Sequence, residues 1–349
     1  MKLFSSRLSA IAAGALLAVS LVQAPAHAQL PDISAITAPS SQAAFDANRA
    51  WNGLADQINS ALPQGSSVPR NIIPQPAPIN PPAAAWRPAG PQPVGNGHSG
   101  ELSVNGRGYL IHVPHGYNPS RAWPVMVAYS AYQDTAEHFR GYSRLRESAV
   151  GRDAIIVYPR AIGRSWEGSP TAATRPGQDI AFVRAMINDL HRHYNIDRGR
   201  IYATGMSTGG GMAAVSACHM ADIFAGVAGV SGAYYAPVNA GCQNIPVAFL
   251  AYHGTGDTLT NYHGGVRHGV PYLGVPQMFS SYERRNGCHV GRISQAPVGF
   301  NATRVSANGC SKPVQSIKVH GSNHTWWYNP SVADDMWACL LYTSDAADE

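Results

Sequence analysis

The chain has 349 residues, of which 45% are hydrophobic and 13% are charged, and its formal net charge is +5. This composition is typical of a globular protein with a sizeable apolar core. The basic residues are almost all arginine and are scattered, whereas a nucleic-acid partner requires a clustered basic stripe, so we expect no nucleic-acid binding. The sequence contains no C-x-x-C or H-E-x-x-H pattern, and we expect neither a metal site nor a cofactor.

Residues 1–28 have the pattern of a secretory signal peptide. Lys2 and Arg7 form a basic start, an apolar stretch follows over 11–22, and Ala26-His27-Ala28 provides a cleavage site. The apolar stretch is too short for a retained membrane span, and no cysteine follows it for lipid attachment, so we expect no membrane anchor. We therefore expect a secreted protein, extracellular or periplasmic, and a monomer.

Residues 29–98 differ in composition from the rest of the chain. Trp51, Leu54 and Ile58 recur at helical spacing, which predicts one short amphipathic helix. Prolines are dense over 69–93, which indicates an extended, semi-rigid linker. We interpret this segment as a spacer, and a docking segment is the alternative.

From residue 99 to residue 338 apolar runs alternate with helical patterns. The pattern predicts a strand pair over 102–113, strands over 125–129, 154–158, 200–204, 225–230, 247–252 and 316–319, and helices over 135–149 and 178–194. Short buried strands separated by helices form a mostly parallel, doubly covered sheet, so the expected class is α/β. In such sheets the chemistry lies at the carboxyl ends of the strands.

Residues 339–349, CLLYTSDAADE, do not continue the preceding pattern. They resemble a translated sequencing-adapter sequence, and we leave them out of the fold prediction. We expect the catalytic domain to cover residues 99–338 and its last helix to be cut short after Ala338.

The stretch RIYATGMSTGGGMAAVSAC, over residues 200–218, combines a short strand, the pentapeptide Gly205-Met206-Ser207-Thr208-Gly209 and a helix of small residues. Strand, G-x-S-x-G and helix in this order form a nucleophile elbow, whose sharp turn exposes the serine hydroxyl. The helix N-terminus, beginning with the Thr208 amide, could stabilise an oxyanion. The pentapeptide alone is a weak signal in a chain with 35 glycines, so it needs support from an acid and a base.

A serine hydroxyl becomes a nucleophile only when a base removes its proton and a carboxylate orients that base. Asp257 follows the strand predicted over 247–252, and His324 follows the strand predicted over 316–319. The order Ser207, Asp257, His324 is the order found in α/β-hydrolases. His253, at the end of the first of these strands, is expected to have a structural role.

At this point the chain resembles a known group, the secreted α/β-hydrolase esterases that include polyhydroxybutyrate depolymerases and the feruloyl and acetylxylan esterases of carbohydrate esterase family 1. The matching stretches are VYP at 157–159, Trp166, DIAFV at 179–183, YNIDRGRIYATGMSTGGGMAA at 194–214, DIFAGVAGVSG at 222–232, HGTGD at 253–257, NGC at 286–288 and NHTWW at 323–327. The resemblance implies the α/β-hydrolase fold and assigns the triad to Ser207, Asp257 and His324.

One position departs from this family. The family places His-Gly after the strand that corresponds to 125–128, and the backbone beyond it completes the oxyanion hole. This chain has Tyr129-Ser130-Ala131-Tyr132-Gln133 there. We expect Thr208 to supply one oxyanion donor and Ser130 or Ala131 to supply the other.

Four cysteines precede residue 339, and an even number in an exported chain favours disulfides over a thiol nucleophile. Pairing the cysteines that are close in sequence predicts the bonds Cys218–Cys242 and Cys288–Cys310.

Aromatic residues surround the predicted triad in sequence. We expect the rings that bind substrate to be Tyr129, Tyr132, Trp166, Tyr262 and Trp326. Flat apolar rings suit a polyester chain or a phenolic acyl group, and the resemblance also indicates an extracellular polyester or cell-wall ester. The favoured function is a secreted serine esterase acting on polyhydroxyalkanoate-type polyester. The alternatives are a feruloyl or acetylxylan esterase, acyl transfer to a sugar, and a non-catalytic polymer-binding protein on the same fold.

Overall fold

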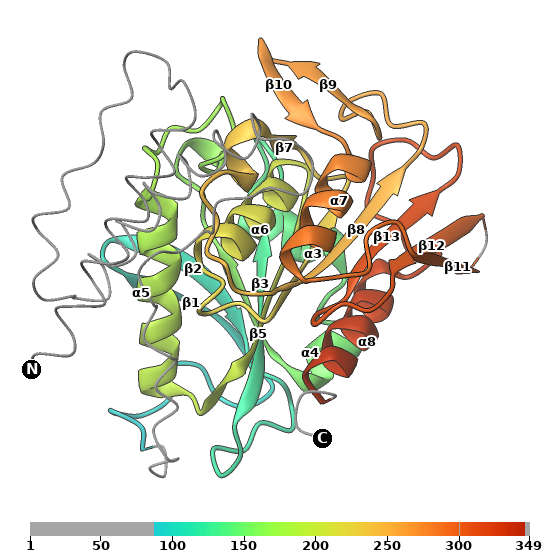
Figure 1. The fold of residues 1–349 in the computed structure, drawn as a ribbon. Helices are drawn as coiled ribbons and strands as arrows, with labels where there is room; N and C mark the ends of the chain where they lie inside the picture. Colours follow the sequence, from blue (N-terminus) through green and yellow to red (C-terminus); the bar gives the residue numbers. More distant parts are fainter. Residues whose placement is uncertain (1–86, 300, 346–349) are drawn as a thin grey trace, which may run out of the picture.

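The computed structural model describes residues 87–299 and 301–345 (Figure 1). The predicted signal peptide, the amphipathic helix and most of the proline-rich linker lie outside the described residues. In the described part of the chain, no helix combines the length and the apolar character that crossing a membrane requires.

The core of the fold is a ten-stranded sheet with the strand order β1-β2-β4-β3-β5-β6-β8-β13-β12-β11. The strands β4, β3, β5, β6, β8 and β13 run parallel, and an antiparallel pair extends the sheet at each end. These strands are β1 (Ser99–Val104), β2 (Arg107–His112), β3 (Trp123–Tyr129), β4 (Ile155–Pro159), β5 (Ile196–Met206), β6 (Gly226–Val230), β8 (Ala248–Gly254), β11 (Ile293–Pro297), β12 (Ala302–Ala307) and β13 (Val314–Val319). This sheet confirms the predicted α/β class.

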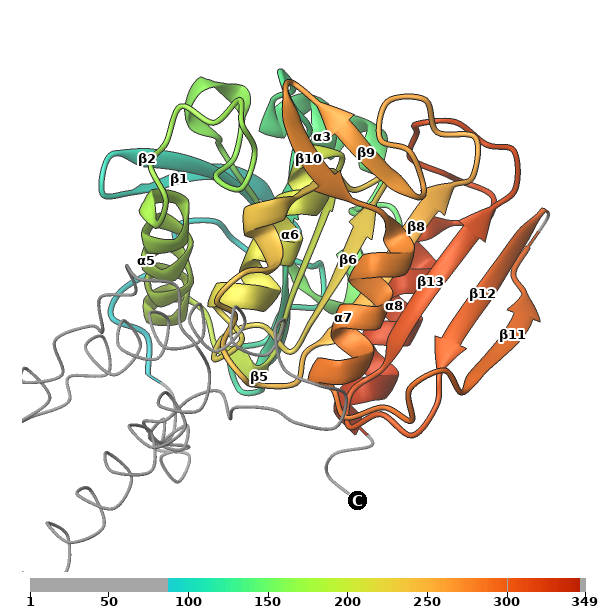
Figure 2. The ribbon, with the colours of Figure 1, turned by 45° about the horizontal axis from the view of Figure 1, so that its top comes forward.

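Helices cover both faces of this sheet (Figures 1 and 2). One face packs against α5 (Gln178–His193), α6 (Thr208–His219) and α7 (Val275–Arg285), and the other against α3 (Ala136–Ser143), α4 (Ala149–Asp153) and α8 (Val332–Asp345). Alternate residues of one strand enter opposite cores: Val125 and Val127 lie in the first, Met126 and Ala128 in the second. Because both faces are buried, the central strands are continuous apolar runs.

The helix predicted over 135–149 is wrong as a single element. Helix α3 ends at Ser143, because Arg144 adopts a left-handed conformation with a φ of 52°. A second helix, α4, begins after Ser148, whose hydroxyl accepts a hydrogen bond from the Val150 N–H. Side-chain capping by Ser148 starts a new helix where the apolar pattern alone suggested a continuous one.

A small second sheet was not predicted from the sequence. It contains β7 (Tyr234–Tyr235), β10 (Val270–Leu273) and β9 (Gly264–Arg267), in that order. The β9–β10 hairpin turns through His268 and Gly269, both with positive φ. Figure 2 shows this hairpin standing out from the ends of the central strands, above α6 and α7. It therefore projects from the main sheet on the side where α6 begins.

The last helix crosses the predicted end of the catalytic domain. Helix α8 continues to Asp345, and Leu340 is buried against Gly226 of β6. The boundary at residue 338 stays a prediction.

Both predicted disulfides are present. Cys218, at the end of α6, is bonded to Cys242, and Cys288, after α7, is bonded to Cys310. Cys339 in α8 is a free thiol that is partly buried.

Candidate active site

Ser207 lies at a sharp turn between β5 and α6. Its backbone has φ 55° and ψ −118°, and its N–H donates a hydrogen bond to the Val230 carbonyl of the neighbouring strand. The two glycines of the motif allow this turn: a Cβ on Gly205 would lie 2.4 Å from the Gly209 backbone, and one on Gly209 would lie 2.2 Å from the Tyr129 carbonyl oxygen. Such a turn presents the serine side chain at the carboxyl end of the sheet.

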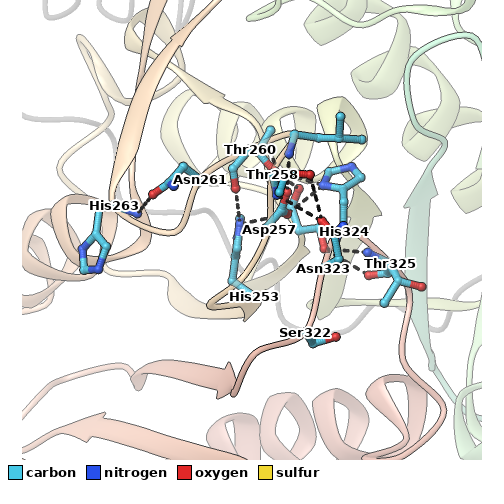
Figure 3. A network of polar contacts seen from close by, with 12 residues as sticks. His253, Asp257, Thr258, Thr260, Asn261, His263, Ser322, Asn323, His324 and Thr325 are labelled. Atoms are coloured by element: carbon cyan, nitrogen blue, oxygen red, sulfur yellow. Dashed lines mark hydrogen bonds and ion pairs between the residues drawn. The ribbon is translucent and has the colours of Figure 1, made fainter.

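Asp257 and His324 are brought together by two adjacent parallel strands. Strand β8 pairs with β13 in a register that places Gly254 opposite Val319, so the loops that follow both strands leave the sheet side by side. The His324 Nδ1 lies 2.8 Å from the Asp257 Oδ2 (Figure 3). This contact places the Nδ1 proton toward the carboxylate and leaves Nε2 able to accept a proton from a hydroxyl.

The Asp257 carboxylate is buried and surrounded by donors. Its Oδ1 accepts hydrogen bonds from the N–H groups of Leu259 and Thr260, each 2.8 Å long. Burial raises the pKa of this carboxyl group, but the hydrogen bonds from His253, His324 and the Thr260 N–H outweigh it and hold the pKa well below its usual range. Asp257 is therefore an anion whose position is set by its own loop.

Sequence reasoning missed Thr260 and Asn323, which hold the two loops in place. The Thr260 hydroxyl lies 3.1 Å from both the Asp257 Oδ2 and the His324 Nδ1. The Asn323 side-chain oxygen accepts hydrogen bonds from the Thr258 N–H and the His324 N–H, which ties the second loop to the first (Figure 3). Asn323 is the first residue of the NHTWW stretch, whereas the sequence signal for Thr260 is its closeness to Asp257.

His253 has the structural position expected for it. It is buried, and its Nε2 lies 2.6 Å from the Thr260 carbonyl oxygen and 3.2 Å from the Asp257 Oδ2. Both partners are acceptors, so Nε2 carries a proton. His253 thus supports the loop of Asp257 from below.

A cavity of about 560 Å³ opens over this site. Ser207 and His324 both line it, and so do the predicted residues Thr208, Ala131, Tyr132 and Trp326. The remaining lining residues are Asp134, His138, Tyr142, Met206, Ala233, Tyr235, Leu259, Thr260, Arg267, His268, Thr325 and Tyr328. A cavity of this size can enclose a small organic substrate.

Comparison with known proteins shows which enzymes this chain resembles. Residues 108–256 match the family described as esterase PHB depolymerase. The feruloyl esterase C of Emericella nidulans is 28% identical over 235 residues, which cover 64% of this chain and 79% of that protein. A probable feruloyl esterase C of Aspergillus terreus is 27% identical over 248 residues, which cover 68% and 85% of the two chains.

The chain is a carboxylic ester hydrolase, and it is similar to the polyhydroxybutyrate depolymerase family and to feruloyl esterases. Among solved structures, the acetyl xylan esterase from Aspergillus awamori has a TM-score of 0.50 and 18% sequence identity, over 66% of this chain and 94% of that one. The esterase therefore shares the α/β-hydrolase fold, as its sequence predicts.

Three rings expected to contact substrate lie behind the cavity of the esterase. Trp166 is fully buried and packs edge-on against Tyr129, with ring centroids 5.1 Å apart. Tyr129 is also buried, and its hydroxyl lies 2.9 Å from the Ser216 Oγ. Tyr262 packs against the ring of His253. The prediction that these three rings line the cavity is wrong, because their side chains are part of the hydrophobic core.

The segment after β3 has its two oxyanion candidates in different surroundings. Ala131 lines the cavity of the esterase, whereas Ser130 is buried and does not. The Ser130 carbonyl accepts a 2.9 Å hydrogen bond from the Trp166 Nε1. Trp166 therefore ties down the backbone immediately before Ala131.

The cavity wall also contains groups that sequence reasoning did not select, Tyr142, Tyr235, Tyr328 and Arg267. They come from distant elements, and only the fold brings them together. Within the part of the esterase that the structure describes, no cluster of three His, Cys, Asp or Glu side chains could hold a metal ion.

Proposed function

We propose that the esterase is exported and hydrolyses polyhydroxyalkanoate-type polyester through Ser207, His324 and Asp257. The observation that carries this proposal is the 2.8 Å contact between His324 and the buried Asp257, together with the position of His324 and Ser207 in the wall of one cavity. Such an arrangement supports acyl transfer through a serine nucleophile.

In the proposed reaction, the Ser207 Oγ attacks the ester carbonyl carbon while His324 Nε2 takes the hydroxyl proton. The Asp257 carboxylate stabilises the resulting imidazolium. The imidazolium then protonates the departing alkoxide, and an acyl-enzyme remains on Ser207. Water, activated by the same imidazole, attacks the acyl-enzyme and releases the acid product.

The proposed oxyanion hole consists of the N–H groups of Thr208 and Ala131. Thr208 is the first residue of α6, so its amide lies at the positive end of the helix dipole. Ala131 is preferred to Ser130 because only Ala131 lines the cavity. Two backbone donors stabilise the tetrahedral oxyanion without any reorganisation during the reaction.

The aromatic cavity wall supports an apolar acyl chain or a phenolic acyl group. Tyr132, Tyr142, Tyr235, Trp326 and Tyr328 contribute rings to it. The family match favours polyester, while the relatives named feruloyl esterases favour a ferulate ester as the second candidate substrate.

Export is proposed from the signal-peptide pattern of residues 1–28 and from the two disulfides, which form in oxidising compartments. Residues 29–98 would then act as a spacer before the catalytic domain.

The substrate assignment is tested by incubating the esterase separately with polyhydroxybutyrate film, methyl ferulate, acetylated xylan and a long-chain triglyceride. We expect the fastest release of acid from the polyester. Preference for methyl ferulate would select the second candidate. Preference for the triglyceride or for acetylated xylan would contradict both assignments.

A further inference from the structure

Among the described residues, the cavity wall contains one carboxylate, that of Asp134, and one guanidinium group, that of Arg267, and these two groups do not pair with each other. Both oxygens of the Asp134 carboxylate are occupied. Oδ1 accepts hydrogen bonds from the Thr135 N–H and lies 2.7 Å from the His138 Nδ1, while Oδ2 accepts one from the Tyr142 hydroxyl. The Asp134 carboxylate is therefore held by three groups of its own segment, from Thr135, His138 and Tyr142.

Arg267 contrasts with Asp134. It lines the same cavity, is only partly buried, and forms no ion pair with a carboxylate of the described residues. One hydrogen bond is present, from its Nη1 to the Leu259 carbonyl oxygen at 3.3 Å. A guanidinium group has five N–H donors, so most of its donors remain able to bind a ligand.

Arg267 lies on the β9–β10 hairpin, which contacts the rest of the fold both through β10 and at its tip. It is the last residue of β9, directly before the tight turn through His268 and Gly269. Strand β10 pairs with β7, and the Tyr272 hydroxyl accepts a hydrogen bond from the Asn261 N–H. At the tip, the His268 ring packs edge-on against Tyr132, with centroids 6.0 Å apart. The guanidinium thus projects from a scaffold anchored at both ends.

The Arg267 guanidinium lies close to the loop after β8 that contains Asp257. Leu259, whose carbonyl accepts the Arg267 hydrogen bond, donates its own N–H to the Asp257 carboxylate. A substrate that reaches both Ser207 and Arg267 would place its ester and its carboxylate within one cavity of about 560 Å³, so these two groups must lie close together along the substrate. The planar guanidinium matches a carboxylate through two parallel hydrogen bonds.

We propose that Arg267 binds a free carboxylate of the ester substrate, so that acid-terminated oligomers of hydroxy acids are the preferred substrates. This inference rests on the proposed function and narrows its substrate class from internal bonds of a polymer to short chains or chain ends. The carboxylate can belong to the alcohol part of the ester, as in a hydroxy-acid dimer, or to the acyl part, as in a hemiester.

Two matched pairs of substrates distinguish a carboxylate in the alcohol part of the ester from one in the acyl part. The first pair is the linear dimer of 3-hydroxybutyrate as the free acid and as its methyl ester. The second pair is the 4-nitrophenyl hemiester of glutaric acid and 4-nitrophenyl valerate. The readout is the ratio of kcat/KM for the acid to kcat/KM for its neutral partner. We expect a ratio of at least about ten in one of the two substrate pairs. The ratio should decrease as the salt concentration rises, because salt screens the partly exposed contact between Arg267 and the substrate carboxylate.

The variants are R267Q and R267K, with R292Q as the control at an exposed position. R267Q should bring the ratio to about one, R267K should leave an intermediate ratio because a lysine lacks the planar fork, and R292Q should keep the wild-type ratio. Equal loss for acid and neutral esters in R267Q would overturn the inference, since Arg267 would then only support the Leu259 carbonyl. A wild-type ratio near one in both pairs would also overturn it.

Failure of the polyester assignment gives a different result. In that case neither dimer is cleaved while the nitrophenyl esters are, and the second pair alone then decides whether Arg267 binds a carboxylate.

Discussion

Ser207 combines an unusual backbone conformation with its proposed role as nucleophile. A positive φ is strained for a residue with a side chain, and here the strain is maintained by the hydrogen bond to Val230 and by the two close-packed glycines. Alanine can replace serine at this position without any new steric conflict, because it carries the same Cβ and lacks only the hydroxyl.

Replacing Ser207 by alanine should lower ester hydrolysis by about 10⁶-fold while the protein stays folded. The nucleophile is lost, and neither His324 nor Asp257 can replace it. Initial rates with a nitrophenyl ester, together with circular dichroism, measure both effects, and a fluorophosphonate probe should label the wild type alone. S306A, on β12, is the control. More than a few per cent of wild-type activity in S207A would refute the assignment.

Replacing Trp166 by phenylalanine should lower kcat by about ten- to a hundredfold, with a smaller effect on KM. The ring is retained, but the Ser130 carbonyl loses its indole donor and the backbone before Ala131 is freed. Steady-state kinetics and the inhibition constant of a boronic-acid transition-state analogue measure the change.

The control for this variant is W337F. Trp337 donates its indole N–H to Asp153 on the other face of the sheet, so its loss should reduce stability without changing kcat. A similar kcat in W166F and the wild type would show that the indole hydrogen bond does not position the oxyanion donor.

At the scale of elements, the start of α5 is joined to the loop that contains Trp166. Glu167 and Asp179 exchange hydrogen bonds, each backbone N–H donating to the carboxylate of the other at 2.8 Å. Arg107 pairs with the second Asp179 oxygen at 2.8 Å. Gly177, at the N-cap position, has no side chain that could cap α5. The Glu167 carboxylate, from the preceding loop, accepts the hydrogen bond from the Asp179 N–H in the first turn and so replaces a local cap.

This arrangement predicts a pH dependence of stability. Burial raises the pKa of Glu167 to about 6, partly opposed by hydrogen bonds from backbone N–H groups. The Glu167 carboxyl group therefore binds a proton more tightly in the folded protein than in the unfolded chain. Its contribution to the free energy of unfolding is complete below about pH 4.5 and is lost as the pH rises through about 6. The free energy of unfolding should lose about 2 kcal/mol from this group between those limits.

Urea unfolding of the wild type and E167Q at several pH values measures this contribution. Glutamine does not titrate, so the stability of the wild type relative to E167Q should be greater at about pH 4.5 than at about pH 7.5. E147Q, at an exposed position, is the control. A difference that is constant or grows with pH would contradict the assignment.

At the scale of the whole molecule, the two disulfides strengthen the end of the sheet opposite the site. Ser207 directly precedes α6 and Cys218 lies near the other end of that helix, while Cys288 and Cys310 lie before β13 begins. The cross-linked residues are 24 and 22 positions apart, so both bonds close short loops.

Removing either bond, as C218A/C242A or C288A/C310A, should lower the free energy of unfolding by about 3 kcal/mol. The stabilisation comes mainly from restricting the unfolded chain, so kcat should stay at the wild-type value well below the unfolding temperature. Urea unfolding and ester hydrolysis at low temperature measure the two effects. A lower kcat in the folded double variants would imply that the bonds also shape the active site.

The sequence by itself determined the parts of this protein that depend on short windows. The glycines around Ser207 are required by local sterics, and apolar runs mark the central strands because both sheet faces are buried. Asp257 and His324 could be found because each follows such a run, and parallel strands bring their ends to one edge. Pairing neighbours in sequence was sufficient for both disulfides.

Only the tertiary structure decided which side chains reach the cavity. Tyr129 and Tyr132 are three residues apart, yet the first points into the core and the second into the cavity, because one ends a strand and the other lies in the loop beyond it. Arg267 is brought to the triad by the β9–β10 hairpin, whose pairing with β7 joins segments that are distant in sequence. Loop direction and pairing between such segments are set by packing across the whole fold, and no short window of sequence contains that information.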